Sequence, residues 1–216
     1  MILLNLKKRL YTSILLLFLI FLIFSFKLFL TYTLIILGVL SIIEFLNLLK
    51  KITKNKIYLT SLSFLFVTYI FVFCFIFLFF STFLQLKIIL FSLLLGCAAS
   101  DIGGFVFGKI FKGPKLSKIS PNKTISGSIG SIILTILIMT GSIFYFTETF
   151  SYVFLLVAFI TSITCQLGDL FFSLLKRKAK IKDTGNFFPG HGGVLDRLDG
   201  ILLGIPAGYI SIILLF

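Results

Sequence analysis

The segment from residues 173 to 199 concentrates the residue types that phosphate chemistry requires. It contains six basic residues, three aspartates, four glycines and the only histidine of the chain, His191. Cationic side chains bind phosphate oxygens, carboxylates together with phosphates hold Mg²⁺, and glycines let backbone N–H groups approach an anion. The pattern therefore predicts a phosphate-binding site with a divalent cation. A soft metal is not supported, because the sequence has no Cys/His cluster.

Four aspartates are placed where they could meet between helices. Asp101 and Asp169 lie inside apolar stretches, and an acid at membrane depth is costly unless it faces a cavity, a partner or an ion. Asp196 and Asp199 are three residues apart, which puts them on one face of the first turn of a helix. The alternatives are a hydrogen bond to a neighbouring helix for Asp101 or Asp169, and a helix-capping role for Asp199.

A second polar segment, residues 109–127, offers further phosphate-binding side chains. These are Ser120, Lys123 and Thr124. Just before it, residues 103–109 match most of a P-loop, but Ile110 replaces the hydroxyl residue that would hold the metal, so the match is weak. The two glutamates, Glu44 and Glu148, lie near the ends of apolar stretches and are interpreted as incidental.

The composition requires a membrane protein to position these side chains. The chain is 59% hydrophobic and 12% charged, against about 25% charged residues in a soluble domain, which excludes a soluble globular fold. A helical span needs about 20 apolar residues, and helices satisfy the backbone within lipid. We expect an all-α, polytopic integral membrane protein with about seven transmembrane helices. The expected spans are residues 10–26, 28–46, 57–80, 86–108, 128–147, 152–172 and 200–216.

These spans predict two regions. Residues 1–85 form N-terminal membrane spans, and residues 86–216 form a catalytic membrane domain whose cytoplasmic loops, 109–127 and 173–199, make the site. Small residues inside the apolar stretches are interpreted as packing residues. They are the cysteines Cys74, Cys97 and Cys165, and the glycines Gly200, Gly204 and Gly208, which recur every four residues.

The basic residues that give the chain its net charge of +13 lie almost entirely on one side of the expected spans. Of the 20 basic residues, 18 fall on one side of the expected spans, and only Lys27 and Lys87 fall on the other. The positive-inside rule then places the N-terminus and both loops in the cytoplasm and the C-terminus outside. Attraction to anionic lipid explains the charge, and nucleic acid is not expected as a partner. No small-residue cleavage site follows the first apolar stretch, so we expect a retained span rather than a signal peptide.

Residues 173–199 resemble the signature of the phosphatidate cytidylyltransferases, also called CDP-diacylglycerol synthases. The matching pattern is Ser173-x2-Lys176-Arg177-x4-Lys182-Asp183-x-Gly185-x2-Phe188-Pro189-x-His191-Gly192-Gly193-x2-Asp196-Arg197-x-Asp199. The resemblance extends over residues 101–208 through three further stretches, which are Asp101 with Gly103-Gly104-Phe105, Ser120 to Thr124, and Gln166 to Asp169. One position departs from the family, which usually has Glu where this chain has Ser126.

The resemblance implies a reaction in phospholipid biosynthesis. CMP passes from CTP to phosphatidate, giving CDP-diacylglycerol and pyrophosphate, with Mg²⁺, alone or with a second cation, as the cofactor. Asp169 and Asp196 are then the first metal-ligand candidates, Asp101 is a further one, and Lys182 completes the expected catalytic set. The remaining matched residues are expected to bind substrate: Ser120, Lys123, Thr124, Ser173, Lys176, Arg177, Asp183, His191, Gly192, Gly193, Arg197 and Asp199.

The resemblance also implies an inner or plasma membrane location, contact with membrane lipid, and a homodimer. His191 is expected to donate a hydrogen bond or organise its loop, with acid–base catalysis as the alternative. Two other functions stay open. In a transporter or channel, Asp101 and Asp169 would line an ion path, but the sequence shows no obvious inverted repeat. A CTP-dependent lipid kinase acting on a polyprenol or phytol-type alcohol would need a base for its hydroxyl nucleophile and would release CDP.

Overall fold

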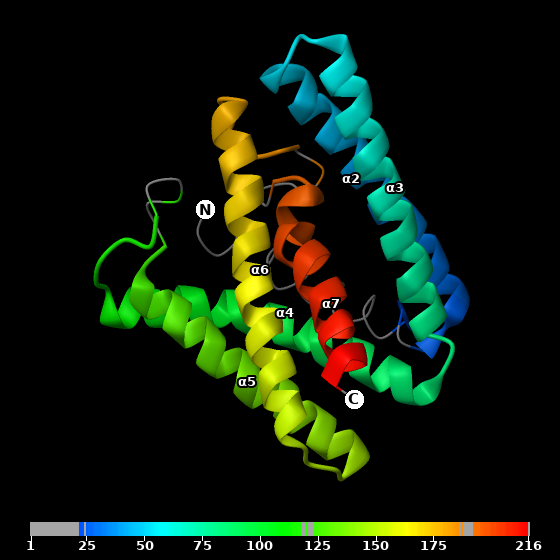
Figure 1. Ribbon diagram of the computed structural model, residues 1–216, viewed down its shortest axis with the longest axis vertical. Helices are drawn as coiled ribbons and strands as arrows, with labels where there is room; N and C mark the ends of the chain where they lie inside the picture. Colours follow the sequence, from blue (N-terminus) through cyan, green and yellow to red (C-terminus); the bar gives the residue numbers. More distant parts are fainter. Residues whose placement is uncertain are drawn as a thin grey trace, which may run out of the picture.

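The computed structural model describes residues 22–23, 25–117, 120, 123–185, 187 and 192–215. Within these ranges the named elements of secondary structure are all helices, and Lys115 pairs with Thr124 in an isolated bridge. The helices are α2 (Lys27–Ile52), α3 (Lys56–Phe80), α4 (Leu84–Phe111), α5 (Ile125–Thr147), α6 (Tyr152–Lys178) and α7 (Leu195–Leu215) (Figure 1). The all-α fold class is therefore confirmed over the described part of the chain.

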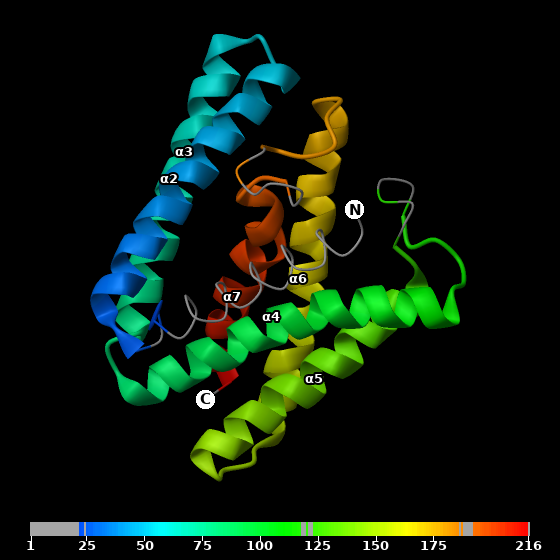
Figure 2. The same ribbon diagram turned by 180° about the vertical axis from the view of Figure 1, so that it is seen from behind.

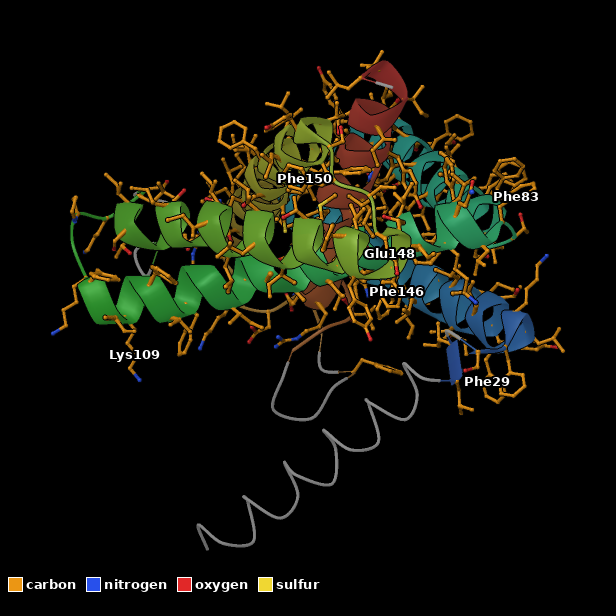
Figure 3. All side chains as sticks on the ribbon, turned by 90° about the horizontal axis from the view of Figure 1, so that it is seen from below. Phe29, Phe83, Lys109, Phe146, Glu148 and Phe150 are labelled. Carbon is orange, nitrogen blue, oxygen red and sulfur yellow. The ribbon has the colours of Figure 1, made fainter. Side chains whose placement is uncertain are left out.

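The six described helices are each long and apolar enough to cross a membrane. Large apolar side chains also cover the outside of the molecule, as the aromatic rings labelled in Figure 3 illustrate. A soluble surface rarely carries so much exposed apolar area, so the protein is a polytopic integral membrane protein. Most of the first expected span, residues 10–26, lies outside the described residues, and the count of seven stays a prediction.

Several helices extend further toward the polar side than the expected spans, and α6 and α7 do so next to the predicted site. Helix α6 continues six residues past the expected end, to Lys178, and α7 begins five residues earlier than expected, at Leu195. Lipid determines where a sequence must be apolar, but backbone hydrogen bonds continue into the headgroup layer. The basic last turn of α6 also suits the negative end of a helix dipole. The connection between the two helices is therefore shorter than the expected loop 173–199, and several predicted site residues are helical.

The helices form three antiparallel pairs, α2 with α3, α4 with α5, and α6 with α7 (Figures 1 and 2). Helix α6 is central, because it contacts α2, α4, α5 and α7. The α2–α3 connection, the end of α6 and the start of α7 lie toward one end of the molecule in Figure 1. The α3–α4 and α5–α6 connections and the C-terminus lie toward the other end. The fold therefore brings the polar ends of α6 and α7 together.

Glycines let α4 and α5 cross at close range. A Cβ atom on Gly103 would lie 2.6 Å from the carbonyl oxygen of Gly130 and 3.0 Å from the Cα of Ser131. Gly104 and Gly108 face α5 in the same way. The run that matches a P-loop is thus the interior of α4, and its glycines serve helix packing, as small residues do between membrane helices.

Replacing Gly103 by Ala is expected to lower the free energy of unfolding by about 1–3 kcal/mol, the usual cost of overpacking. Gly141→Ala, also a helix position but with open space around it, is the matched control and is expected to stabilise by about 0.5–1 kcal/mol. Reaction of a thiol dye with the buried Cys97 and Cys165 reports unfolding in detergent. Equal behaviour of the two variants would contradict the close crossing.

The glycines of α7 also face inward. A Cβ atom on Gly204 would lie 2.9 Å from the Sγ of Cys97, and one on Gly200 would lie 2.6 Å from the Sγ of Cys165. Both cysteines are free and buried, as expected for small packing residues. This glycine face is filled by α4 and α6 of the same chain and gives no support to the expected homodimer, which stays a prediction from the family resemblance.

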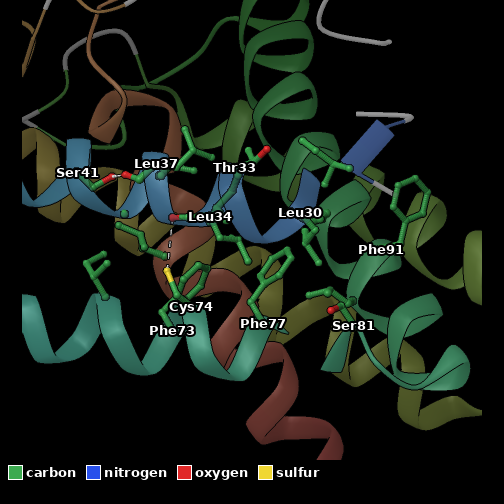
Figure 4. Close-up of a pocket in the computed structure, with 18 of the residues that line it drawn as sticks. Leu30, Thr33, Leu34, Leu37, Ser41, Phe73, Cys74, Phe77, Ser81 and Phe91 are labelled. Atoms are coloured by element: carbon green, nitrogen blue, oxygen red, sulfur yellow. Dashed lines mark hydrogen bonds between the residues drawn. The ribbon is translucent and has the colours of Figure 1, made fainter. Parts of the chain in front are cut away.

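An apolar cavity of about 270 Å³ lies between α2, α3, α4 and α7. Leu34 and Leu37 of α2 face Phe73 and Phe77 of α3 across it (Figure 4). The cavity also reaches Leu198 of α7, which directly precedes Asp199 in the sequence. The cavity and the predicted site therefore share the first turns of α7, although none of the predicted site residues lines the cavity.

Candidate active site

The first ion pair of the site joins the segment before α5 to the interior of α6. The Nζ atom of Lys123 donates a hydrogen bond to the Oδ2 atom of Asp169. Both side chains are about one quarter exposed, at 29% and 26%. The backbone of Lys123 is held on both sides, since its N–H donates to the carbonyl of Ser120 and its carbonyl accepts from the N–H of Leu116. Two residues predicted from separate motifs are therefore in direct contact.

The second ion pair lies where α6 ends and α7 begins. The Nζ atom of Lys176 lies 2.7 Å from Oδ1 of Asp196 and 3.9 Å from Oδ2 of Asp199. The three side chains are almost buried, with exposed fractions of 14%, 8% and 11%. One cation thus balances two carboxylates, and the helical spacing of Asp196 and Asp199 directs both toward it.

The two ion pairs belong to one cluster. The carboxyl group of Asp199 interacts with that of Asp169, and its Oδ1 atom accepts a hydrogen bond of 2.9 Å from the N–H of Gly200. Asp101 of α4 lies within electrostatic range of Asp169 and of Arg197. Carboxylates from α4, α6 and α7 therefore gather around the ammonium groups of Lys123 and Lys176.

Asp196 also holds two separate parts of the connection between α6 and α7 together. Its Oδ2 atom accepts hydrogen bonds from the backbone N–H of Thr184, at 2.8 Å, and of Gly193, at 3.0 Å. Its Oδ1 atom accepts from Lys176. Gly192, one residue earlier, has φ +84°, a conformation that favours glycine. This carboxylate therefore organises the glycine-rich segment as well as facing the cluster.

Glu44 of α2 is a site residue that the sequence interpretation missed. Its side chain is buried, and its carboxylate accepts hydrogen bonds from the hydroxyl of Thr184 and from the backbone N–H of Val194 and Leu195. The prediction that Glu44 is incidental is wrong. Its partners are 140 to 151 residues away in sequence, so no local pattern indicates the contact. The available signal was an acid in an apolar stretch, the signal that was used for Asp101 and Asp169.

The remaining predicted residues of the second loop surround this cluster. Ser173 is half-buried in α6, while Arg177, Lys182, Asp183 and Arg197 have exposed side chains. Exposed cationic groups beside the buried ion pair are suited to an anionic substrate that arrives from water. His191 lies outside the described residues, and its predicted role stays a prediction.

The segment before α5 is ordered by its own hydroxyl groups. The side chain of Thr124 accepts a hydrogen bond of 3.1 Å from the N–H of Gly127 and so caps α5. The hydroxyl of Ser126 lies 3.0 Å from that of Thr124 and donates to the carbonyl of Lys112. Ser126, at the position where the family usually has Glu, therefore connects the start of α5 to the end of α4. The predicted substrate contact of Thr124 stays a prediction.

The donor set fits a hard divalent cation. Mg²⁺ takes one or two protein carboxylates and completes its shell with water and substrate phosphates. Asp169, Asp196 and Asp199 offer such oxygens, although no three Asp, Glu, His or Cys side chains of the described residues are spaced to enclose a metal by themselves. The complete metal site would therefore form only when substrate phosphates supply the remaining ligands.

Comparison with known proteins decides the family. The model of the cytidylyltransferase family matches residues 3–215, nearly the whole chain. The chain belongs to the cytidylyltransferase family.

Individual members of this family confirm the resemblance seen in the sequence. The phosphatidate cytidylyltransferase of Mycobacterium leprae (strain TN) is 43% identical over 115 residues, which are 52% of this chain and 36% of the relative. That of Staphylococcus haemolyticus (strain JCSC1435) is 41% identical over 109 residues, 50% of this chain and 42% of the relative. That of Rickettsia bellii (strain RML369-C) is 46% identical over 114 residues, 49% of both chains. The chain thus matches less than half the length of these curated cytidylyltransferases.

Proposed function

We propose that the protein transfers CMP from CTP to phosphatidate and forms CDP-diacylglycerol and pyrophosphate. The cluster of Lys123 and Lys176 with Asp169, Asp196 and Asp199 is the observation that supports this function most directly. It combines cations for phosphate with carboxylates for a metal ion, at the polar ends of membrane helices. The names of the similar proteins support the same reaction.

The proposed reaction requires little acid–base chemistry. A phosphate oxygen of phosphatidate forms a bond to the α-phosphorus of CTP, and the bond from that phosphorus to the bridging oxygen breaks, so that pyrophosphate leaves with the electron pair. The attacking phosphate is already ionised at neutral pH. The protein must therefore bring two anions together and stabilise the charge of the leaving group, which are effects of positioning and electrostatics.

We assign the metal to Asp169 and Asp196, with Asp101 as a further ligand, and Mg²⁺, alone or with a second cation, as the ion. Bound Mg²⁺ would supply positive charge to the phosphates that react. The same carboxylates now hold the ammonium groups of Lys123 and Lys176, so binding of the metal would release these groups to substrate phosphates.

The remaining predicted site residues are assigned to substrate binding. Lys182 is an exposed residue of the α6–α7 connection and directly precedes Asp183. We propose that it binds the triphosphate of CTP. The other residues proposed to contact phosphate or lipid headgroup are Ser120, Thr124, Ser173, Arg177, Gly192, Gly193 and Arg197, while Asp183 and Asp199 are proposed to contact the nucleotide.

We propose that the site faces the cytoplasm, with the N-terminus on the same side of the inner or plasma membrane. The 18 basic residues on one side of the expected spans support this orientation. CTP then reaches the site from water and phosphatidate reaches it from the bilayer.

The test is turnover by the purified full chain in detergent with labelled CTP, Mg²⁺ and phosphatidate. We expect labelled CDP-diacylglycerol and equimolar pyrophosphate, and no product when EDTA removes the metal ion. Release of CDP with a polyprenol or phytol-type acceptor would indicate a lipid kinase instead. Ion flux in vesicles without nucleotide turnover would indicate a transporter.

A further inference from the structure

Glu44 connects the N-terminal helix pair to the start of α7. One carboxylate oxygen of Glu44 accepts from the N–H of Val194 at 3.0 Å, and the other accepts from the N–H of Leu195 at 2.8 Å. The first N–H groups of an α-helix have no partner within the helix, and a negative charge is favoured at this end. Glu44 therefore caps α7 from a different helix.

The same carboxylate also binds Thr184, an earlier residue of the α6–α7 connection. The hydroxyl of Thr184 donates a hydrogen bond of 2.8 Å to Glu44, while the backbone N–H of Thr184 donates to Asp196. On the far side, Gly193 donates to Asp196 and Val194 donates to Glu44. Two carboxylates, one from α2 and one from α7, thus hold residue 184 next to residues 193–195.

The surrounding backbone is fitted closely around this carboxylate. A Cβ atom on Gly185 or on Gly193 would overlap the carboxylate oxygens of Glu44. Glycine at these two positions allows the chain to pass on both sides of the acid. The glycines at 185 and 193 in the family pattern therefore pack against Glu44, and this packing requires glycine at 193 independently of the substrate contact proposed for it.

We infer that Glu44 is a positioning residue for the reaction. It holds Thr184 next to residues 193–195 and so positions Lys182, Asp183 and Asp196, which lie beside them in the sequence. The expected effect of Glu44 on activity rests on the proposed function. Its expected effect on the α6–α7 connection does not. Glu44 gives the N-terminal spans a part in the site, since residue 44 belongs to the region predicted to supply membrane spans only. Glu44 itself touches neither ion pair, so it acts through Thr184, Val194 and Leu195.

The test compares Glu44→Gln with Glu148→Gln in the full chain. Glutamine keeps the size of the side chain, but its NH₂ group meets N–H donors and leaves at least one of them without an acceptor. Glu148 is exposed at the end of α5, so the same substitution there serves as the matched control. We expect kcat at saturating CTP and phosphatidate to fall about 10- to 100-fold in Glu44→Gln, as for outer partners of a metal site, and to stay unchanged in Glu148→Gln.

Hydrogen–deuterium exchange supplies a measurement that needs no activity. We expect faster exchange in peptides that cover residues 181–198 of Glu44→Gln, with α4 and α5 unchanged. Thr184→Val removes the hydroxyl bond and leaves the backbone bond to Asp196, so it is expected to cause a smaller change of the same kind. If the wild-type protein makes no CDP-diacylglycerol, the proposed function fails while this exchange experiment still tests the contact.

Three results would overturn the inference. Unchanged exchange over residues 181–198 would show that Glu44 does not hold the segment. Faster exchange through all the helices would show that Glu44 supports the whole fold and not this segment. A rise in the KM for phosphatidate with an unchanged kcat would show that Glu44 contacts the lipid directly.

Discussion

Replacing Asp169 by Asn is expected to lower turnover of CTP by more than about 100-fold, beyond the usual loss for outer partners of a metal site. Asparagine keeps one acceptor oxygen but removes the charge that a divalent cation requires. The protein should remain folded, because both side chains of the Lys123–Asp169 pair keep some contact with water and asparagine can still accept a hydrogen bond from Lys123. Product formation from labelled CTP at saturating phosphatidate measures the effect.

Asp169→Asn separates chemistry from folding better than the corresponding change at Asp196. Asp196 accepts hydrogen bonds from Lys176, Thr184 and Gly193, so Asp196→Asn is expected to abolish turnover and also to loosen the α6–α7 connection. The thiol-dye unfolding assay checks that each variant is folded. A rate near that of the wild type in Asp169→Asn, with the protein intact, would refute its role as a metal ligand.

Replacing Lys176 by Met is expected to reduce the free energy of unfolding by about 3–5 kcal/mol, the usual result of removing one partner from a buried ion pair. The variant leaves Asp196 and Asp199 facing each other without the cation that lies between them. Methionine has a similar length and supports a helix, so packing and helix propensity change little. Thermal unfolding in detergent, followed by dye reaction at the buried cysteines, measures the loss.

Two further measurements make the Lys176 result specific. Lys178→Met changes an exposed residue of the same last turn and is expected to leave the unfolding temperature nearly unchanged. Added Mg²⁺ should raise the unfolding temperature of Lys176→Met more than that of the wild type, because a divalent cation can replace the missing charge between the carboxylates. The same unfolding temperature in Lys176→Met and Lys178→Met would contradict the buried ion pair.

The helices could be predicted from the sequence where polar residues border the apolar stretch closely. The span expected at 57–80 corresponds to α3, Lys56–Phe80, and the start expected at residue 152 is the start of α6. The ends at Lys178 and Leu195 could not be predicted in this way, because hydropathy records the depth of the lipid and not where backbone hydrogen bonding stops. The helical state of Ser173, Lys176 and Arg177 follows from the longer α6.

The residue types of the site could be predicted, whereas their pairing could not. Aspartates and lysines in a membrane protein indicate a site on their own, but which lysine meets which aspartate depends on how α5, α6 and α7 pack. Lys123 could have met Asp101 or Asp196 as readily as Asp169. Glu44 was missed for a related reason, since its contacts depend on the packing of α2 against α7.

The separation of Glu44 from its partners sets an order of assembly during synthesis. Glu44 is made 140 to 151 residues before Thr184, Val194 and Leu195, a delay on the order of ten seconds at ordinary rates of translation. Until α7 has been inserted, its carboxylate lacks these three donors, and a buried acid without hydrogen bonds is costly. The α2–α3 hairpin can therefore reach its final packing only after the last helix has arrived. A chain interrupted before α7 therefore lacks two of the three donors to this carboxylate.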